Sequence, residues 1–515
     1  MTKRRQPRLR DFQNLFGRRL LIILLVILQA VFSILLIMRY AQFRWIANVF
    51  ELLSVITALH LLMRQVKPAL KISLIFFILL FPLFGGILYW MFYLQTTAHF
   101  GVRKKVLLME QTRRADYRYQ SVPSEEICEQ LPTNQILAHY LESVAGFPVY
   151  RNTESTYFPT GNEMLTSLLE DLKRAERYIF LEYFIIAKGE MWDGILEILC
   201  EKVAQGVDVR VIYDDFGCFL TLPPKYAQRL QQSGIQCRVF NKVYPLLSSA
   251  HNNRDHRKIA VIDGQVAYTG GINLADEYIN KKIRYGHWKD CAIRIKGDGA
   301  WAFTTMFLQM WALLSGKEED VLVYQPTPSV CERSSGWIQP YTDSPVSTEN
   351  VGERVYMHLI QNARRYLYIT TPYLMVDDDL ISALKFAAKS GVDVRILTPE
   401  IPDKKLVHFT TRTYYPELLE AGVRIYEYSE GFIHSKCFIS DDIIATVGTA
   451  NLDFRSLYFH FECGTCLYRT DSILSVKQDF LNTVEKSKPI FKNDCKTGLF
   501  ARLMQRIVRL FAPLM

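Results

Sequence analysis

The sequence lacks both the composition of a disordered chain and the cysteine spacing of a zinc-binding one. Only 22% of the residues are charged and 49% are hydrophobic, so the chain has enough apolar surface to build folded cores. The 10 cysteines are scattered, and the one CxxC pair, Cys463 and Cys466, has no second pair at zinc-finger spacing. We therefore predict no metal or cofactor site and interpret the cysteines as ordinary strand and core residues.

The N-terminal segment also lacks an A-x-A cleavage site, although its basic start and apolar run are typical of signal peptides. The run at 20–38 has only Gln29 and Ser33 as polar residues. At about 1.5 Å per helical residue it nearly spans the hydrocarbon core of a bilayer. Because more apolar sequence follows, we predict an uncleaved membrane span.

Two further apolar runs extend this region. The run at 46–63 is a weaker candidate because it contains Glu51 and His60, whereas the run at 72–94 contains no charge. We predict an all-α membrane region over 1–100, with spans near 20–38, 46–63 and 72–94. Both of its flanks are basic, so three spans cannot satisfy the positive-inside rule for both. The orientation stays open, and we expect the bulk of the chain in the cytoplasm.

From about residue 150 the pattern changes to strands that alternate with helices, and this pattern occurs twice. The pentapeptide Gly-Val-Asp-Val-Arg stands at 206–210 and again at 391–395. A repeat this long predicts two homologous α/β domains, each with a mostly parallel sheet. The predicted divisions are a connecting segment at 101–149, a first domain at 150–315, a linker at 316–350, a second domain at 351–498 and a basic amphipathic helix at 499–515.

Each repeat carries the string H-x-K-x4-D followed by an asparagine that a glycine-led turn introduces. These residues are His256, Lys258, Asp263 and Asn273 in the first repeat and His434, Lys436, Asp441 and Asn451 in the second. On a strand, positions i and i+2 face the same side, so each histidine points with its lysine. A neutral imidazole is a competent nucleophile or acid-base group, and an ammonium can hold a phosphate oxygen.

One such string could be a solvated strand edge, but two copies at matching places in a repeat favour a shared site. If the two domains pack about a pseudo-twofold axis, both histidines and both lysines converge on one phosphate. One histidine can then attack the phosphorus while the other protonates the leaving oxygen. This chemistry requires no metal, and we find no cluster of ligand residues that would hold one.

The paired motifs resemble the phospholipase D superfamily, and the sequence around them resembles the bacterial cardiolipin synthases. The phrases that carry the second resemblance lie at 83–89, 252–258, 270–278, 288–290, 448–456 and 461–462. The resemblance implies two phospholipase D-like α/β domains behind a transmembrane region. It implies a phosphatidyltransferase of the bacterial cell membrane, which joins two phosphatidylglycerol molecules into cardiolipin and releases glycerol.

The resemblance also implies a role for each site residue. His256 would attack the phosphate and form a phosphohistidine, and His434 would act as the acid and then the base. Lys258, Lys436, Asn273 and Asn451 would hold the phosphate. Asp290 and Glu462, each downstream of the histidine in its own repeat, would orient the histidines. Asp263 and Asp441, the last residues of the two motifs, are expected to be structural partners rather than proton carriers.

Other functions are compatible with parts of the sequence. A net charge of +9 indicates anionic partners, which include nucleic acids, membrane surfaces and phosphorylated substrates. A phospholipase D or a nuclease would differ only in using water to resolve the intermediate. The predicted anchor disfavours a soluble nuclease, so we expect anionic lipids and no nucleic acid as partners. Intact motifs disfavour a non-enzymatic scaffold, and three spans before a long soluble region disfavour a transporter.

Three weaker candidates remain. Asp214, with Asp215 and Gly217, follows a strand and could serve a functional loop or cap a helix. Glu182 could face the site or be a buried structural carboxylate. In the C-terminal helix, Arg502, Arg506 and Arg509 share one side. This basic amphipathic pattern is typical of a membrane-surface helix and equally of a helix docked on the domain.

Overall fold

The computed structural model describes residue 31 and residues 40–64, 66–82, 85–86, 89–90, 118–128, 130–242, 253–317, 319–328, 330–347 and 349–515. The chain forms two compact units. The larger comprises 104–242, 253–509 and 515, and contains both sheets and all four motif histidine and lysine residues. The smaller comprises 1–103, 243–252 and 510–514.

Within the smaller unit, the described helices are α2 (Tyr40–Leu62), α3 (Pro68–Leu80) and the short 3-10 helix η6 (Ala512–Leu514). Helices α2 and α3 pack on each other, and the Ser54 hydroxyl donates to the carbonyl of Pro82 at 2.9 Å. Among the described residues, no helix combines the length and the hydropathy that a bilayer crossing needs. The predicted span at 20–38 lies outside the described residues except for residue 31, as does much of 83–94.

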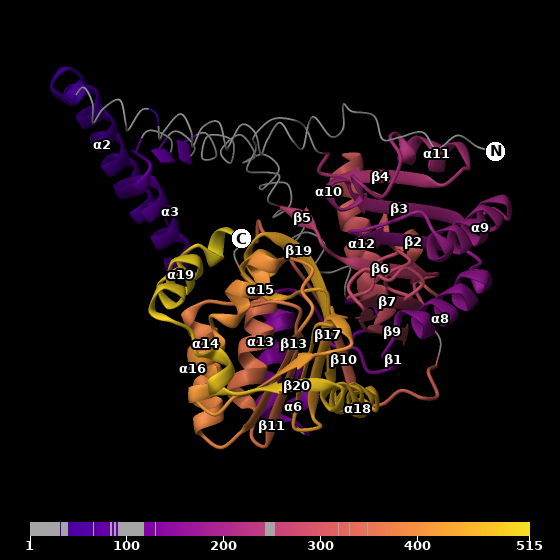
Figure 1. Cartoon of the computed structure of the whole chain (residues 1–515). Helices are drawn as coiled ribbons and strands as arrows, with labels where there is room; N and C mark the ends of the chain where they lie inside the picture. Colours follow the sequence, from indigo (N-terminus) through magenta and orange to yellow (C-terminus); the bar gives the residue numbers. More distant parts are fainter. Residues whose placement is uncertain are drawn as a thin grey trace. The chain divides into compact units, whose positions relative to one another are not determined.

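Two sheets with one topology dominate the larger unit (Figure 1). The first has the order β1-β9-β7-β6-β2-β3-β4, and the second has β10-β19-β17-β16-β11-β13-β14, with β20 added at the end and β5 pairing with β19. Taken in chain order, the two sheets place equivalent strands in equivalent positions. The predicted repeat of a phospholipase D-like α/β fold is therefore seen in the strand order itself.

The first sheet consists of β1 (Thr153–Phe158), β2 (Tyr178–Tyr183), β3 (Asp208–Asp214), β4 (Gln236–Phe240), β6 (Lys258–Ile262), β7 (Val266–Gly270) and β9 (Ala292–Gly297). The second consists of β10 (Trp337–Asp343), β11 (Tyr366–Thr370), β13 (Asp393–Pro399), β14 (Arg424–Tyr428), β16 (Cys437–Ser440), β17 (Ile444–Gly448), β19 (His460–Tyr468) and β20 (Ser487–Ile490). The short strands are β5 (Arg254–Asp255), β8 (His287–Lys289), β12 (Leu374–Met375), β15 (Gly431–Ile433) and β18 (Leu452–Asp453).

Helices cover the sheets. Those before and around the first sheet are α6 (Glu125–Cys128), α7 (Pro132–His139), η2 (Tyr140–Val144), α8 (Gly161–Arg174), α9 (Glu190–Ala204), α10 (Asp215–Cys218), α11 (Tyr226–Gln232) and α12 (Ala300–Ser315). Those that follow are η4 (Val321–Tyr324), α13 (Val351–Asn362), α14 (Asp378–Lys389), α15 (Lys405–Arg412), α16 (Tyr415–Glu420), α17 (Phe454–Tyr458), α18 (Ser472–Glu485), η5 (Lys492–Cys495) and α19 (Leu499–Leu510). Helix α12 is apolar almost all round, so it is buried against the first sheet and also contacts β10.

The prediction of mostly parallel sheets is wrong. Along the main strand path of each sheet, only β2·β3·β4 and β11·β13·β14 pair in parallel, and the other pairs are antiparallel; outside that path, β5 pairs in parallel with β19. The reason is local, because a short turn at Asp263 and Gly264 joins β6 directly to β7 as a hairpin. Both turn residues have positive φ, which an Asp-Gly pair adopts readily.

Two segments that we predicted as connections contribute to the folded unit. In the described part of 101–149, the side chains of Ile127, Leu137 and Leu141 are buried in the main core. In 316–350, β10 forms the edge of the second sheet. This strand contains Pro340, which an edge strand tolerates because its outer side does not need a full ladder of hydrogen bonds.

Asp263 and Asp441, which end the two motifs, hold neighbouring strands in place through backbone hydrogen bonds. The Asp263 carboxylate accepts the N–H groups of residues 176, 177 and 178 at 2.8 Å each. The Asp441 carboxylate accepts those of residues 364, 365 and 366 at 2.7 to 2.9 Å. Four strand residues lie between each motif lysine and its aspartate, so the five steps along the strand place the two about 16 Å apart at 3.3 Å per residue.

We expect Asp441→Asn to lower the free energy of unfolding by about 2 kcal/mol or more, because its amide turns a donor toward buried N–H groups. Asparagine tolerates the positive φ of residue 441, so the change tests hydrogen bonding rather than strain. The measurement is chemical unfolding of the detergent-purified protein. Asp379→Asn, at an exposed position of α14, is the control and should change the value by less than about 0.5 kcal/mol. Equal effects of the two changes would contradict the anchoring role.

Candidate active site

The two motifs occupy equivalent places and meet within the larger unit. His256 stands between β5 and β6, and His434 between β15 and β16. Lys258 begins β6, and Lys436 directly precedes β16. All four side chains are at least nine-tenths buried.

Each histidine is held by a carboxylate from the other repeat. His256 Nδ1 lies 2.9 and 3.0 Å from the two carboxylate oxygens of Glu462. His434 Nδ1 lies 2.7 Å from Asp290 Oδ2. Sequence reasoning placed each carboxylate downstream of the histidine in its own repeat, but the structure pairs them crosswise. With each Nδ1–H donating to its carboxylate, each Nε2 presents a lone pair to the site.

Backbone hydrogen bonds also cross between the two repeats at each histidine. Strand β5 runs parallel to the start of β19, and β15 runs parallel to β8. The N–H of His256 donates to the carbonyl of Phe461 at 2.9 Å, and the N–H of His434 donates to the carbonyl of Lys289 at 2.7 Å. Each histidine is therefore fixed at both backbone and ring by the segment of the other repeat that carries its carboxylate.

Burial and crowding of positive charge depress the basicity of the four motif side chains. Burial lowers the pKa of Lys258 to about 7 and also lowers the pKa of Lys436, against the opposing effect of the carboxylates. Burial, with the nearby lysines, lowers the pKa of His434 to about 4 and that of His256 well below its usual value. Each lysine ammonium donates to the carbonyl of its motif histidine. The lowered pKa values thus come first from burial, and neighbouring positive charges add to it for the two histidines and Lys258.

The pKa values of the two orienting carboxylates shift in opposite directions. Burial raises the pKa of Glu462 above its usual value. Burial also acts to raise the pKa of Asp290, but His434, Lys436 and the N–H of Cys291 outweigh it and lower the pKa overall. Thr449, which the sequence reasoning missed, donates its hydroxyl to Glu462 Oε2 at 2.5 Å and accepts the N–H of Cys463 at 2.9 Å. Thr449 therefore positions Glu462.

The two predicted phosphate-binding asparagines follow β7 and β17, the strands that pair with β6 and β16. Asn273 accepts the N–H of Ile185 at 2.9 Å and donates to the hydroxyl of Tyr278 at 2.6 Å. Asn451 donates to Asp453 Oδ2 at 3.1 Å, and its buried Oδ1 has no hydrogen-bond partner in the described part of the chain. An amide carries two N–H donors, so each asparagine retains one for a ligand.

The weaker candidates have structural contacts. Asp214 caps α10 by accepting the N–H groups of Phe216 and Gly217 at 2.8 and 3.0 Å, and it also accepts the N–H of Asp255 beside His256. Glu182 is fully buried and pairs with Arg257 at 2.6 Å. Both therefore support the backbone of the first motif, as a cap and a buried ion pair.

A third histidine enters the site. His460 lies on β19 two residues before Glu462, and its ring centroid is 5.6 Å from that of His256. We expected no cluster of metal-ligating residues, but the ligand atoms of His256, His460 and Glu462 lie within 4.8 Å of one another. The i, i+2 spacing of His460 and Glu462 on a strand was the available signal, because such residues share a face.

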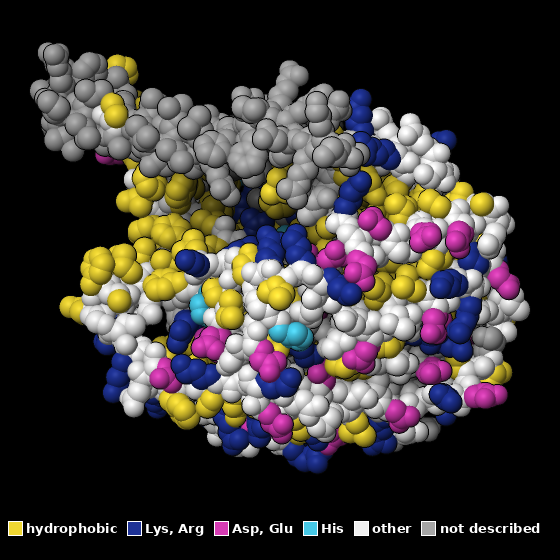
Figure 2. All heavy atoms as spheres, turned by 45° about the vertical axis from the view of Figure 1, so that its right-hand side comes forward, with side chains coloured by type: hydrophobic (Ala, Val, Ile, Leu, Met, Phe, Trp, Pro, Cys, Tyr) yellow, Lys and Arg dark blue, Asp and Glu magenta, His cyan; other side chains and the backbone are white. Residues whose placement is uncertain are grey.

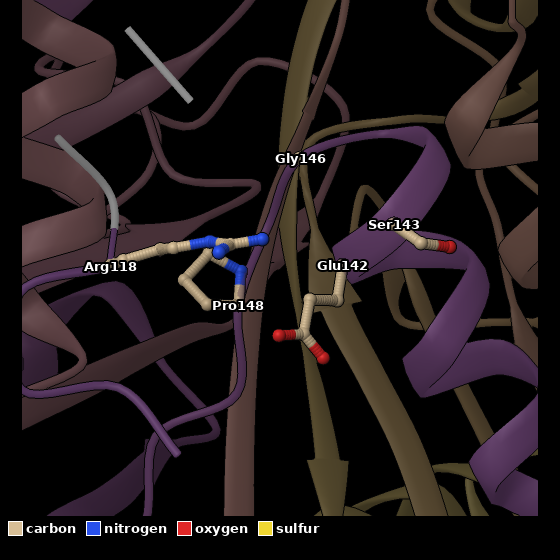
Figure 3. A pocket seen from close by; sticks show the side chains of 5 residues that line it. All are labelled: Arg118, Glu142, Ser143, Gly146 and Pro148. Atoms are coloured by element: carbon tan, nitrogen blue, oxygen red, sulfur yellow. The ribbon is translucent and has the colours of Figure 1, made fainter. Parts of the chain in front are cut away.

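A separate small pocket is lined by Arg118, Glu142, Ser143, Gly146 and Pro148 (Figure 3). The Glu142 carboxylate accepts the N–H of Ser124 at 2.9 Å, which ties two neighbouring segments together. The pocket contains no residue of the paired motifs, and the Glu142 hydrogen bond gives it a structural role.

Comparisons with known proteins agree on one family. The family described as "Cardiolipin synthase, PLD-like domain" matches residues 168–311 and 356–484. A cardiolipin synthase from Geobacillus sp. is 37% identical over 456 residues, which cover 87% of this chain and 89% of the relative. An uncharacterised protein of Streptococcus mutans is 44% identical over 463 residues, with coverage of 89% and 99%. The crystal structure of phosphatidylserine synthase from Haemophilus influenzae shares the fold, with a TM-score of 0.55, 16% identity and coverage of 72% and 95%.

The crossed pairing predicts a specific pattern of energetic coupling. In double-mutant cycles on the free energy of unfolding, the effects of His256→Ala and Glu462→Gln should differ from additivity by about 1 kcal/mol or more. The reason is the buried hydrogen bond between the two side chains. Coupling of His256→Ala to Asp290→Asn should be smaller, below about 0.5 kcal/mol. The reverse pattern, with His256 coupled mainly to Asp290, would contradict the exchange between repeats.

Proposed function

The chain belongs to the cardiolipin synthase family with phospholipase D-like domains, and on that premise we propose that it transfers the phosphatidyl group of one phosphatidylglycerol to another. The products are cardiolipin and glycerol. The observation that carries the proposal is the pair of buried histidines, each oriented by a carboxylate of the other repeat. This arrangement provides a nucleophile and an acid-base group for one phosphodiester.

In the first step, Nε2 of His256 attacks the phosphorus of the donor lipid. A phosphorus–nitrogen bond forms, the bond to the glycerol headgroup breaks, and His434 gives the departing oxygen a proton. Lys258, Lys436 and the free N–H groups of Asn273 and Asn451 hold the phosphate oxygens. An anionic phosphate brings negative charge next to these groups, so its binding raises the pKa of the lysines and of His434.

In the second step, neutral His434 removes a proton from a glycerol hydroxyl of the acceptor lipid. The oxygen attacks the phosphorus, the bond to His256 breaks, and cardiolipin leaves. The resolving group is an alcohol rather than water in this proposal. Apolar rings around the histidines support it: Phe184 lies 5.0 Å from His256, and Trp288 and Phe432 lie 5.5 and 5.9 Å from His434, measured between ring centroids.

Exposed apolar side chains follow the same strand in both sheets and favour a lipid substrate. After β3, Phe216 and Leu220 are 50% and 76% exposed. After β13, Leu406 and Phe409 on α15 are 56% and 38% exposed. The end of β3 lies near His256, since Asp214 at that end accepts the N–H of Asp255. We propose that these two segments contact the acyl region of the bilayer.

We further propose that the protein works as a multi-pass protein of the bacterial cell membrane, with the spans predicted above. The face seen in Figure 2 exposes hydrophobic side chains among Lys, Arg, Asp and Glu, and the exposed apolar side chains support this proposal. Helix α19 has features of a membrane-surface helix and also of a helix docked on the domain. Its Leu499, Phe500 and Leu503 are exposed, while Arg509 pairs with Glu417 of α16 at 2.5 Å.

The direct test is incubation of the purified protein in detergent with phosphatidylglycerol as the sole lipid, followed by mass spectrometry. We expect cardiolipin and free glycerol in equal amounts. His256→Ala and His434→Ala should each lower the rate by about a thousandfold or more, because they remove the nucleophile and the acid-base group.

Phosphatidic acid without cardiolipin would contradict the transferase and support a hydrolase. The order of roles has its own readout. In His434→Ala, a phosphatidyl adduct should be found on the peptide that contains His256. An adduct on His434 in the His256→Ala protein would reverse the two roles.

The apolar segments predict a dependence on the lipid surface. Leu220→Ser and Leu406→Ser should each lower the rate on phosphatidylglycerol vesicles about tenfold, since an inserted leucine contributes about 1.5 kcal/mol or more. The rate on a water-soluble short-chain substrate should not change. Phe386→Ser, at a 74%-exposed position on α14, is the matched control and should leave both rates unaltered. Loss of both activities in the leucine variants would point to a folding defect rather than a lipid contact.

A further inference from the structure

Beside the first catalytic histidine lies a group of three metal-ligating side chains that the proposed reaction does not require. His256 Nδ1 is 2.9 Å from Glu462 Oε1, and His460 Nδ1 is 3.7 Å from the same oxygen. The second distance is too long for a hydrogen bond. Both ring nitrogens of His460 are buried and have no hydrogen-bond partner among the described residues.

The spacing of these atoms suits a small divalent cation. Tetrahedral Zn²⁺ binds imidazole nitrogen and carboxylate oxygen at about 2.0 to 2.2 Å, which puts neighbouring ligand atoms about 3.4 Å apart. The two separations from Glu462 Oε1, 2.9 and 3.7 Å, lie on either side of that value, and the ligand atoms of all three residues lie within 4.8 Å of one another, so a modest closing of the side chains completes the site. Two imidazoles and one carboxylate are a donor set that Zn²⁺, Co²⁺ and Fe²⁺ accept, with a further position for water or a phosphate oxygen.

The surroundings supply what a metal site needs beyond its ligands. Thr449 donates to Glu462 Oε2, so the carboxylate is oriented while Oε1 faces the two histidines. Strand β19 carries both His460 and Glu462, and its parallel pairing with β5 fixes the backbone beside His256. The three ligands thus come from backbone that is already held in place.

We infer that His256, His460 and Glu462 form a site for a divalent transition metal such as Zn²⁺, and that occupancy inhibits the enzyme. The nucleophile needs a lone pair on Nε2, which the Nδ1–H···Glu462 bond provides. A metal on Nδ1 takes the place of that single ring proton, which moves to Nε2, so Nε2 no longer has a free lone pair for attack. The metal also withdraws Glu462 from His256. The inhibitory effect rests on the proposed function, whereas metal binding does not.

Metal binding is measured first, without any lipid, by equilibrium dialysis of the full chain against Zn²⁺ and by the absorption spectrum of the Co²⁺ form. We expect one tight site. His460→Gln should weaken Zn²⁺ binding about tenfold or more, since even partners behind the ligands contribute tenfold to a hundredfold. His460→Cys should restore binding with a thiolate-type Co²⁺ spectrum, which shows that the variants fold and that residue 460 is a ligand.

Two control variants separate this site from others. His434→Ala removes the equivalent histidine of the second motif and should bind Zn²⁺ like the unaltered chain. His139→Gln removes an exposed histidine of α7 and should also bind normally. Equal Zn²⁺ affinity of His460→Gln and the unaltered chain, or no tight site at all, overturns the inference.

The inhibition is measured as cardiolipin formation at increasing free Zn²⁺, buffered with a chelator. The concentration for half-inhibition should equal the dissociation constant from dialysis and rise about tenfold or more in His460→Gln, in parallel with binding. Inhibition that is unchanged in His460→Gln overturns the regulatory part. A chain that binds Zn²⁺ through His460 yet makes no cardiolipin would leave the metal site standing and refute the proposed function instead.

Discussion

The exchange of carboxylates between the two repeats is the constraint on which the rest of the structure depends. A buried neutral imidazole needs a partner at Nδ1 to fix its tautomer, and here that partner always comes from the other repeat. The short pairs β5·β19 and β8·β15 make the same exchange in the backbone. Neither repeat can therefore assemble an oriented histidine by itself, and the two must close on each other before the chemistry exists.

This closed arrangement explains the electrostatics of the site. Bringing two lysines and two histidines into one buried space is unfavourable, and the depressed pKa values of Lys258 and His434 express that cost. An anionic phosphodiester removes the charge imbalance when it binds.

The two repeats are alike in topology but not in the support of their carboxylates. Thr449 donates to Glu462, whereas the equivalent residue of the first repeat is Gly271. A Cβ at Gly271 would stand 2.0 Å from Asp290 Oδ1, so glycine there is required by the close approach of the carboxylate. The second repeat carries Glu462, which accepts a hydrogen bond from the Thr449 hydroxyl and has His460 beside it. The first repeat carries the shorter Asp290, which packs closely against Gly271. Such a difference allows the two histidines to take different roles.

The sequence by itself determined the repeat and the two motifs, because a repeated pentapeptide and a repeated motif string are local properties. It also pointed to Asp290 and Glu462 through family resemblance. Only the tertiary structure decided which carboxylate serves which histidine, that β10 belongs to a sheet, and that His460 joins His256. These facts depend on contacts between residues far apart in the chain, such as His256 and Glu462, and no local pattern encodes such a contact. The antiparallel pairing of β6 with β7 follows from the Asp263–Gly264 turn, a signal that was present in the sequence but was outweighed by the alternation of strands and helices.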